Sequence, residues 1–118
     1  MPAGARRDYA QRVLDLYRLV PGQIGPLRRC DRWLAAALHD QGVRLEIVAA
    51  ALLLAVARRS FRSASAEPLL PVATLHYFRP VIAEIIAQPP DPGYLAHLRR
   101  KVACVAPRFA AALDHQLP

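Results

Sequence analysis

A long apolar segment constrains the fold of this chain more than any other feature. It runs from Leu45 to Arg59, LEIVAAALLLAVARR, and no polar side chain interrupts it between Ile47 and Ala57. Alanine and leucine favour a helix, and a helix that is apolar on every side must be covered by protein on every side. Eleven apolar residues are too few to span a bilayer, which takes roughly 20. The segment therefore predicts a central helix wrapped by other helices.

The rest of the chain predicts shorter helices separated by proline and glycine. Apolar residues repeat at helical spacing over residues 5–20, 27–41 and 72–88, and in two segments that begin at Pro92 and Pro107. Pro80 predicts a kink in the third of these helices, or two short helices that meet at Arg79. We therefore expect an all-α fold in which residues 1–118 form a single compact domain. This domain is a bundle of five or six helices around the central helix at about 45–59.

The connection between the helices over 27–41 and 45–59 is short and contains Gly42. A short connection predicts that the two helices pack as an antiparallel hairpin. An alternative is a helix-turn-helix motif, because Leu38, Gly42 and Val48 have spacings like those of that motif. The second helix of such a motif needs an exposed polar face to enter a DNA groove. The apolar run offers none, which favours the hairpin.

The helix over 27–41 is predicted to pack mainly against the core. Its expected inward residues are Leu27, Cys30, Leu34, Ala37 and Leu38. Trp33 borders this face and is expected to pack at the edge of the core with its N–H outward. Cys30 and Cys104 have no spacing typical of a zinc or redox motif, so we interpret both as buried reduced thiols.

The sequence offers no catalytic constellation. Its nine acidic residues are scattered singly, its four histidines lack the paired spacing that holds a metal, and its five glycines form no phosphate-binding series. We therefore expect no enzyme activity, no metal and no cofactor. The first residues, MPAGARRDYAQ, include no apolar run after their basic residues. Neither a signal peptide nor a membrane anchor is expected, and the predicted location is the cytoplasm.

The charge of the chain favours a polyanionic partner. Fifteen arginines and one lysine outnumber nine acidic residues, which gives a net charge of +7 and a pI of about 10.4. A GC-rich genome also enriches arginine, alanine and proline, but a basic domain attracts polyanions whatever the origin of its arginines. Nucleic acid is the commonest partner of this kind.

The predicted hairpin concentrates arginines at one end of the bundle. Each of its helices has about 15 residues and a length of roughly 22 Å, so the beginning of one lies beside the end of the other. Six arginines would then share this end: Arg28, Arg29, Arg32, Arg58, Arg59 and Arg62. The helix dipole stabilises cations at a helix C-terminus, which accounts for the last three, but it disfavours the first three at a helix N-terminus.

Because three of these arginines destabilise the helix end at which they lie, their presence indicates an external anion. Guanidinium groups suit phosphate oxygens. We therefore predict that these six arginines bind nucleic acid. Tyr77 and Arg79 are added as candidate contacts because an aromatic ring there can stack on a base, although Phe78 between them is expected in the core. Arg99, Arg100 and Lys101 form a secondary basic patch, for which the dipole of their helix is a sufficient explanation.

Part of the chain resembles the C-terminal helical domain of DnaD-like primosome and replication-initiation proteins. The resemblance covers roughly residues 9–88 and follows the order of Tyr17 with PGQIGPL, Trp33, VAAALLLAVA and YFRPVIAEI. The family has a tyrosine, an isoleucine and a tryptophan at successive fourth positions, where this chain has Tyr77, Val81 and Ile85. The resemblance implies binding of single- or double-stranded DNA in replication loading, with Tyr77 as the best match.

Together these features predict a non-catalytic nucleic-acid-binding helical module. We expect a DNA-binding accessory factor in replication or mobile-element biology, with DNA favoured over RNA and no membrane contact. One alternative is a protein-interaction or oligomerisation domain, in which Leu69, Leu70 and Leu117 or a second apolar face of the helix over 72–88 meet a partner chain. Another is a small helical subunit of an RNA-containing complex.

Overall fold

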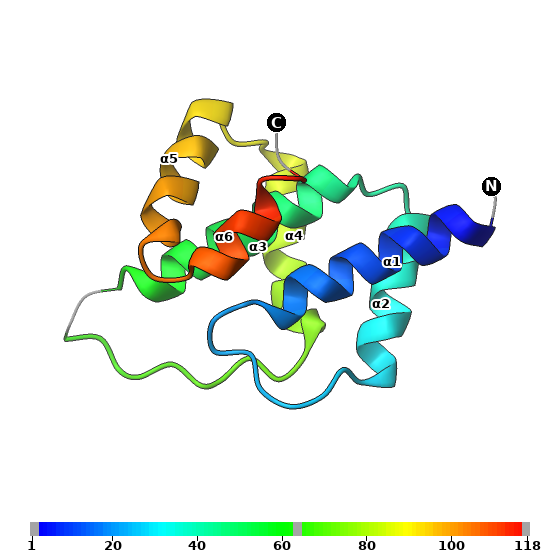
Figure 1. Ribbon diagram of the computed structural model, residues 1–118, viewed down its shortest axis with the longest axis horizontal. Helices are drawn as coiled ribbons and strands as arrows, with labels where there is room; N and C mark the ends of the chain where they lie inside the picture. The colour runs from blue at the N-terminus through cyan, green and yellow to red at the C-terminus, as the bar shows by residue number, and fades with distance from the viewer. Residues whose placement is uncertain (1–2, 63–64, 117–118) are drawn as a thin grey trace.

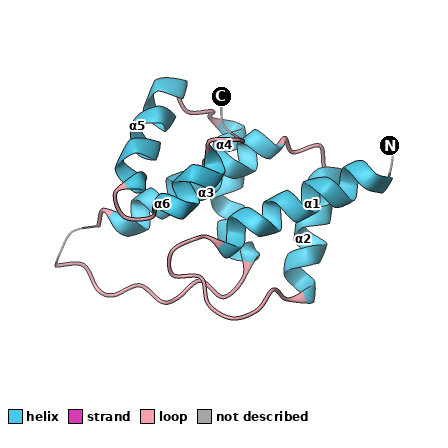
Figure 2. Cartoon of the chain, viewed as in Figure 1, coloured by secondary structure: helices cyan, strands magenta, loops and turns pink. Residues whose placement is uncertain are grey.

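The structure is a computed structural model that describes residues 3–62 and 65–116. Within these ranges the chain forms six α-helices and one short 3-10 helix, η1, with no strand (Figures 1 and 2). In chain order they are α1 (Ala3–Arg18), α2 (Arg29–Asp40), α3 (Leu45–Ser60), η1 (Leu75–Phe78), α4 (Arg79–Ala87), α5 (Pro92–Ala103) and α6 (Pro107–Leu113). The predicted all-α bundle of five or six helices is confirmed.

Helix α3 is the buried centre of the bundle, as the apolar run predicts. All residues from 48 to 57 are buried, and Leu52 and Leu53 are fully inaccessible to solvent. Within the apolar run over 47–57, Ile47 alone is half-buried. Helices α1, α4 and α5 pack against α3 (Figure 1). This burial rules out α3 as the recognition helix of a helix-turn-helix motif, and no helix in the described ranges is long and apolar enough to cross a membrane.

The segment around Pro80 takes the second of its two predicted forms. Helix η1 ends at Phe78 and α4 begins at Arg79, with Pro80 in the first turn of α4. Proline is tolerated there because the first N–H groups of a helix have no partner within the helix. The segment begins as extended chain rather than as helix: the N–H of Val72 donates to Gly22 O at 2.8 Å. The backbone just before η1 is thereby joined to the turn after α1.

Helix α2 packs on α1 and η1 and diverges from α3, so the predicted antiparallel hairpin is wrong (Figure 1). The turn between the helices contains Gly42 with a φ of +77°. The N–H of Val43 donates to Leu38 O at 3.0 Å and that of Gly42 to His39 O at 3.0 Å, which is the Schellman arrangement. A three- or four-residue turn with glycine joins helices at wide angles as well as in hairpins. The length of the connection therefore did not determine the packing.

Two contacts from α1 hold the end of α2 in place. Arg6 donates two hydrogen bonds to the Asp40 carboxylate, at 2.9 and 3.0 Å. The hydroxyl of Tyr9 donates to Val43 O at 2.7 Å, and burial raises the pKa of Tyr9 to about 12. Helix α1 thus covers the apolar side of α2 and also contacts α3, while α4 and α5 cover the rest of α3.

Candidate nucleic-acid interface

Asp31, the third residue of α2, carries a fully buried carboxylate. Its oxygens accept hydrogen bonds from the N–H of Arg28 at 3.0 Å, the N–H of Leu75 at 2.9 Å and the hydroxyl of Thr74 at 2.8 Å. Burial alone would raise the pKa of Asp31, but these hydrogen bonds and the nearby His76 outweigh it and hold the pKa below its ordinary value. An ionised Asp31 therefore ties the start of α2 to the start of η1.

The anchored Asp31 sets the rotation of α2 about its axis. The buried residues of this helix are Asp31, Leu34, Ala35 and Leu38. Of the five predicted inward residues, Leu34 and Leu38 are buried, Leu27 and Ala37 are half-buried, and Cys30 is exposed. Because the buried face of α2 includes Asp31, Cys30 and the residues on the opposite face of the helix point outward.

The main consequence of this rotation is the exposure of Trp33. Its side chain is 64% exposed instead of packing at the edge of the core as predicted. The interpretation of Cys104 as a buried thiol is also wrong, because this residue lies exposed just after α5. Sequence reasoning missed the role of Asp31, although an acidic residue at the third helical position is a known capping signal.

The structure places the six predicted arginines on two surfaces. Arg28, Arg29 and Arg32 lie at the start of α2, at the lower right of Figure 1, whereas Arg58, Arg59 and Arg62 lie around the end of α3, at the left. The predicted single cluster is therefore wrong, because it depended on an antiparallel hairpin of α2 and α3. The two sets have to be judged separately.

The arginines around the end of α3 are engaged with the protein itself. Arg58 donates two hydrogen bonds to the Glu84 carboxylate, and this pairing holds the pKa of Glu84 below its ordinary value. Arg62 donates to Glu67 O at 2.7 Å. Each guanidinium thus already holds a neighbouring element, α4 or the loop after α3, which accounts for these arginines without a phosphate ligand.

Arg59 joins three elements around the end of α3. Its guanidinium donates to the hydroxyl of Tyr77 at 3.0 Å and to Leu70 O at 3.0 Å, and it lies 5.3 Å from the centre of the Tyr77 ring. Tyr77 is 42% exposed and meets the buried Phe78 edge to face. Arg79, the other candidate of this region, is exposed at the start of α4. Tyr77 and the three α3-end arginines line an open depression of about 350 Å³.

Replacing Arg59 by glutamine is expected to loosen the segment before η1 without unfolding the bundle. The change removes the bond to Leu70 O and the contact with Tyr77, each worth about 1 kcal/mol, so local opening should become roughly 30-fold more frequent. Limited proteolysis under native conditions measures this opening. Arg79→Gln is the matched control and should be cleaved at the wild-type rate. Equal cleavage of both variants would contradict the structural role of Arg59.

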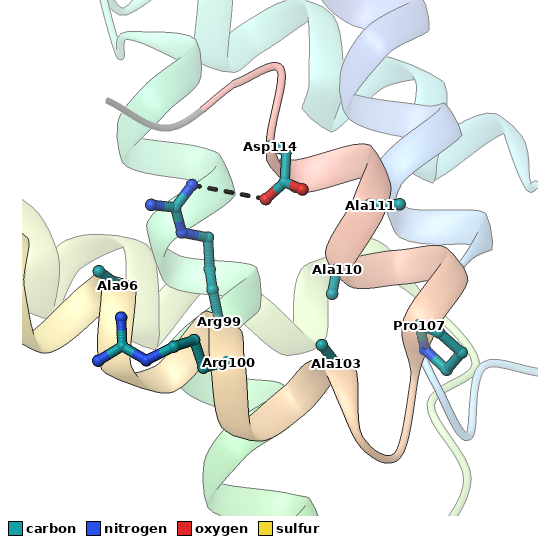
Figure 3. Close-up of a pocket in the computed structure, with 8 residues that line it drawn as sticks. All are labelled: Ala96, Arg99, Arg100, Ala103, Pro107, Ala110, Ala111 and Asp114. Atoms are coloured by element: carbon teal, nitrogen blue, oxygen red, sulfur yellow. Dashed lines mark ion pairs between the residues drawn. The ribbon is translucent and has the colours of Figure 1, made fainter.

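The secondary basic patch is partly neutralised. Figure 3 shows Arg99 of α5 directed at Asp114, which follows α6, and the two groups form an ion pair at 3.6 Å. The ammonium of Lys101 lies 4.4 Å from the centre of the Phe61 ring. Arg100 projects from the same helix beside an alanine-lined depression between α5 and α6 (Figure 3). Two of the three cations therefore help to attach α5 to its neighbours.

The arginines at the start of α2 are different. In the described part of the chain, the side chains of Arg28, Arg29 and Arg32 form no ion pair, and all three are exposed. Arg18, at the end of α1, lines an open depression of about 390 Å³ together with Arg32. We call these four arginines the α2 basic surface. Sequence reasoning missed Arg18, because only the packing of α1 on α2 brings it to this place.

The chemistry of the α2 basic surface rests on its own residues. Among residues 3–62 and 65–116, no three His, Cys, Asp or Glu side chains are grouped so that they would hold a metal ion. Comparisons with protein-family models, curated proteins and solved structures found no match. The fold and this surface define the chain as an all-α bundle with a group of exposed arginines.

Proposed function

We propose that this chain is a non-catalytic nucleic-acid-binding module and that the α2 basic surface binds phosphates. The observation that supports the proposal is the crowding of Arg28, Arg29 and Arg32 at the positive end of α2, without an ion pair in the described residues. The nearest acid, Asp31, is buried and directs its charge at internal donors. Arginines in this position oppose the helix dipole and repel one another. A bound polyanion would relieve both effects.

Within this proposal the module acts as a DNA-binding accessory factor in replication or mobile-element biology. The resemblance of residues 9–88 to DnaD-like proteins supports DNA over RNA and a role in replication. Such a factor would work in the cytoplasm. The engaged α3-end arginines and the secondary patch contribute to the overall positive field rather than to the contact itself.

The direct test is the salt dependence of binding to labelled DNA and RNA. Three or four neutralised phosphates give a log–log slope of about −0.7 per phosphate on single strands and −0.9 on duplex. Affinity should therefore fall roughly 20- to 150-fold between about 50 and about 200 mM salt. Fluorescence anisotropy with single-stranded DNA, duplex DNA and RNA of equal length measures this fall. Absence of binding at the lower salt would contradict the proposal, and binding to RNA alone would favour the RNA-complex alternative.

A second candidate function is protein interaction or oligomerisation. Leu70 is 83% exposed and Leu69 is 42% exposed between Pro68 and Pro71, and Ile86 gives α4 an exposed apolar position at 51%. Leu117, the third leucine predicted for such a contact, lies outside the described residues. Exposed apolar side chains held by proline in a loop favour a partner surface.

For a homo-oligomer formed through this loop, the double variant Leu69→Ser, Leu70→Ser is expected to shift the association equilibrium toward monomer. Burial of two leucines contributes about 2 kcal/mol each, so the dissociation constant should rise by at least a hundredfold. Sedimentation equilibrium over a range of protein concentrations measures the shift, with Val105→Ser, at a 55% exposed position after α5, as a control. A wild-type protein that is monomeric at every concentration would rule this homo-oligomer out.

A further inference from the structure

Trp33 is the most conspicuous exposed side chain beside the α2 basic surface. It is the single tryptophan of the chain and is 64% exposed. Exposure of so large an aromatic ring has a structural cause here, because the anchored Asp31 turns this side of α2 outward. That cause accounts for the orientation but not for the presence of tryptophan, since a polar residue also suits a mostly exposed position. The ring is therefore available to a ligand.

The surroundings of Trp33 identify what the ligand offers. Arg29 lies one helical turn before it and Arg32 directly before it, and neither forms an ion pair in the described chain. Helical side chains lean toward the helix N-terminus, so the indole lies over the turn that carries Arg29. The next acid on α2 along this side, Asp40, is bound by Arg6. An aromatic ring among uncompensated guanidinium groups suits a partner that is flat, apolar and anionic at once.

The neighbours of the ring on its other side leave room for a flat ligand. The residues three and four positions after Trp33 are Ala36 and Ala37, both half-buried. Side chains this small do not cover the indole. A base therefore has space to stack on the ring while its phosphates meet the arginines of the same helix. In a duplex the bases are already stacked on one another and present only their edges, so this contact is open to unpaired bases alone.

We propose that Trp33 is a stacking platform for unpaired bases and that the α2 basic surface binds single-stranded nucleic acid in preference to duplex. This inference rests on the proposed phosphate-binding function and adds the class of ligand. The arginines attract single-stranded and duplex nucleic acid alike, and stacking on Trp33 adds affinity for the single strand only. Stacking is tolerant of sequence because every base has a flat face. Single strands of both DNA and RNA are therefore ligands of this surface.

The intrinsic fluorescence of the full chain reports directly on this contact, since Trp33 is its single tryptophan. Titration with an oligothymidylate or an oligouridylate of about 15 nucleotides should quench the emission. A duplex of equal length, which also binds through phosphates, should leave the emission nearly unchanged. The oligothymidylate and oligouridylate titrations compare DNA with RNA. Binding of labelled oligothymidylate, followed by anisotropy, without quenching would overturn the proposal.

Trp33→Ala is expected to weaken binding of the single strand about tenfold or more and to change binding of the duplex less than about twofold. Trp33→Phe should restore most of the loss, because phenylalanine keeps an aromatic face. Tyr94→Ala, at a 48% exposed position on α5, is the matched control and should bind as wild type. The melting temperature of Trp33→Ala should stay within about 3 °C of wild type, since the ring is mostly exposed.

The outcomes of these experiments distinguish this inference from the proposed function. If Trp33→Ala binds both forms as wild type does, while the wild-type affinity falls steeply with salt, phosphate binding stands and the stacking role is overturned. If wild-type protein binds no nucleic acid at low salt, both are overturned. Emission of the free protein that instead changes with protein concentration would assign Trp33 to a protein contact and contradict the stacking role.

Discussion

Asp31→Asn is expected to lower the free energy of unfolding by about 3 kcal/mol, with a fall in melting temperature of about 10–15 °C. The carboxylate is fully buried and accepts hydrogen bonds from the backbone N–H groups of Arg28 and Leu75 and from the hydroxyl of Thr74, besides a long, weak one from the Cys30 thiol. An amide in its place offers one oxygen only and turns an N–H₂ group toward at least one of these donors. Hydrogen bonds to a charged group contribute about 1.5–3 kcal/mol each, so the loss exceeds that of an ordinary surface change. Urea unfolding monitored by circular dichroism measures it.

The pH dependence of the same variant provides a second measurement. The folded-state pKa of Asp31 is below its ordinary value, so the stabilisation from its ionised form is fully present above the unfolded pKa of about 3.9. It is lost as pH falls through the lower folded pKa. The stability difference between wild type and Asp31→Asn should therefore be constant near neutrality and shrink below about pH 4. A difference that grows on acidification would contradict an ionised Asp31.

A control for this experiment is Asp91→Asn. Asp91 lies at the N-cap of α5, is exposed and forms no side-chain cap bond, and asparagine is as good an N-cap residue as aspartate. This change should cost less than about 0.5 kcal/mol. The comparison separates the effect of a buried, fully bonded carboxylate from the general effect of removing one negative charge.

Replacing Arg28, Arg29 and Arg32 together by glutamine should lower the affinity for single-stranded nucleic acid about 100-fold at 0.1 M salt. If all three neutralise a phosphate, the log–log slope becomes less steep by about 2 on single strands and by nearly 3 on duplex. The fold should be unaffected or slightly more stable, because the change removes positive charge from the positive end of α2. Anisotropy titrations at several salt concentrations measure the slope, and thermal unfolding measures the stability.

A control variant that loses three positive charges outside the α2 basic surface tests whether the loss of affinity is specific to that surface. The variant with glutamine at Arg79, Arg100 and Arg108 loses the same three charges from the start of α4, from α5 and from α6. It should lower affinity only a few-fold, through the overall field. If both triple variants lose affinity equally, binding depends on net charge alone and the α2 basic surface has no special role. A folded α2 variant with wild-type affinity would contradict the proposed function.

The helices of this protein could be predicted from local sequence, because the information for them is local. The apolar run placed α3 at the centre, and Pro80 predicted the division between η1 and α4. Proline in the first turn also marked the starts of α5 and α6. Backbone hydrogen bonding, proline geometry and the periodicity of apolar side chains act within a few residues of one another. Such features can be recognised without knowledge of the packing.

The direction of α2 and its rotation were decided by tertiary contacts. A short turn with Gly42 permits several angles between helices. The packing of α2 on α1, with the contacts of Arg6 and Tyr9 at its end, gives an angle that separates α2 from α3. Asp31 then fixed the rotation by bonds to Thr74 and Leu75, more than 40 positions along the chain. Partners so distant leave no periodic signal.

The composition of the candidate site depends on the direction of α2 and on its rotation. The sequence by itself determined that the chain carries an excess of arginine and that three arginines crowd the start of one helix. Only the packing of the helices decided that Arg58, Arg59 and Arg62 bind the protein's own groups, that Arg18 joins the α2 basic surface and that Trp33 is exposed. The physical reason is that the local sequence specifies a charge or a ring, whereas its exposure and its partners depend on which helices lie beside it.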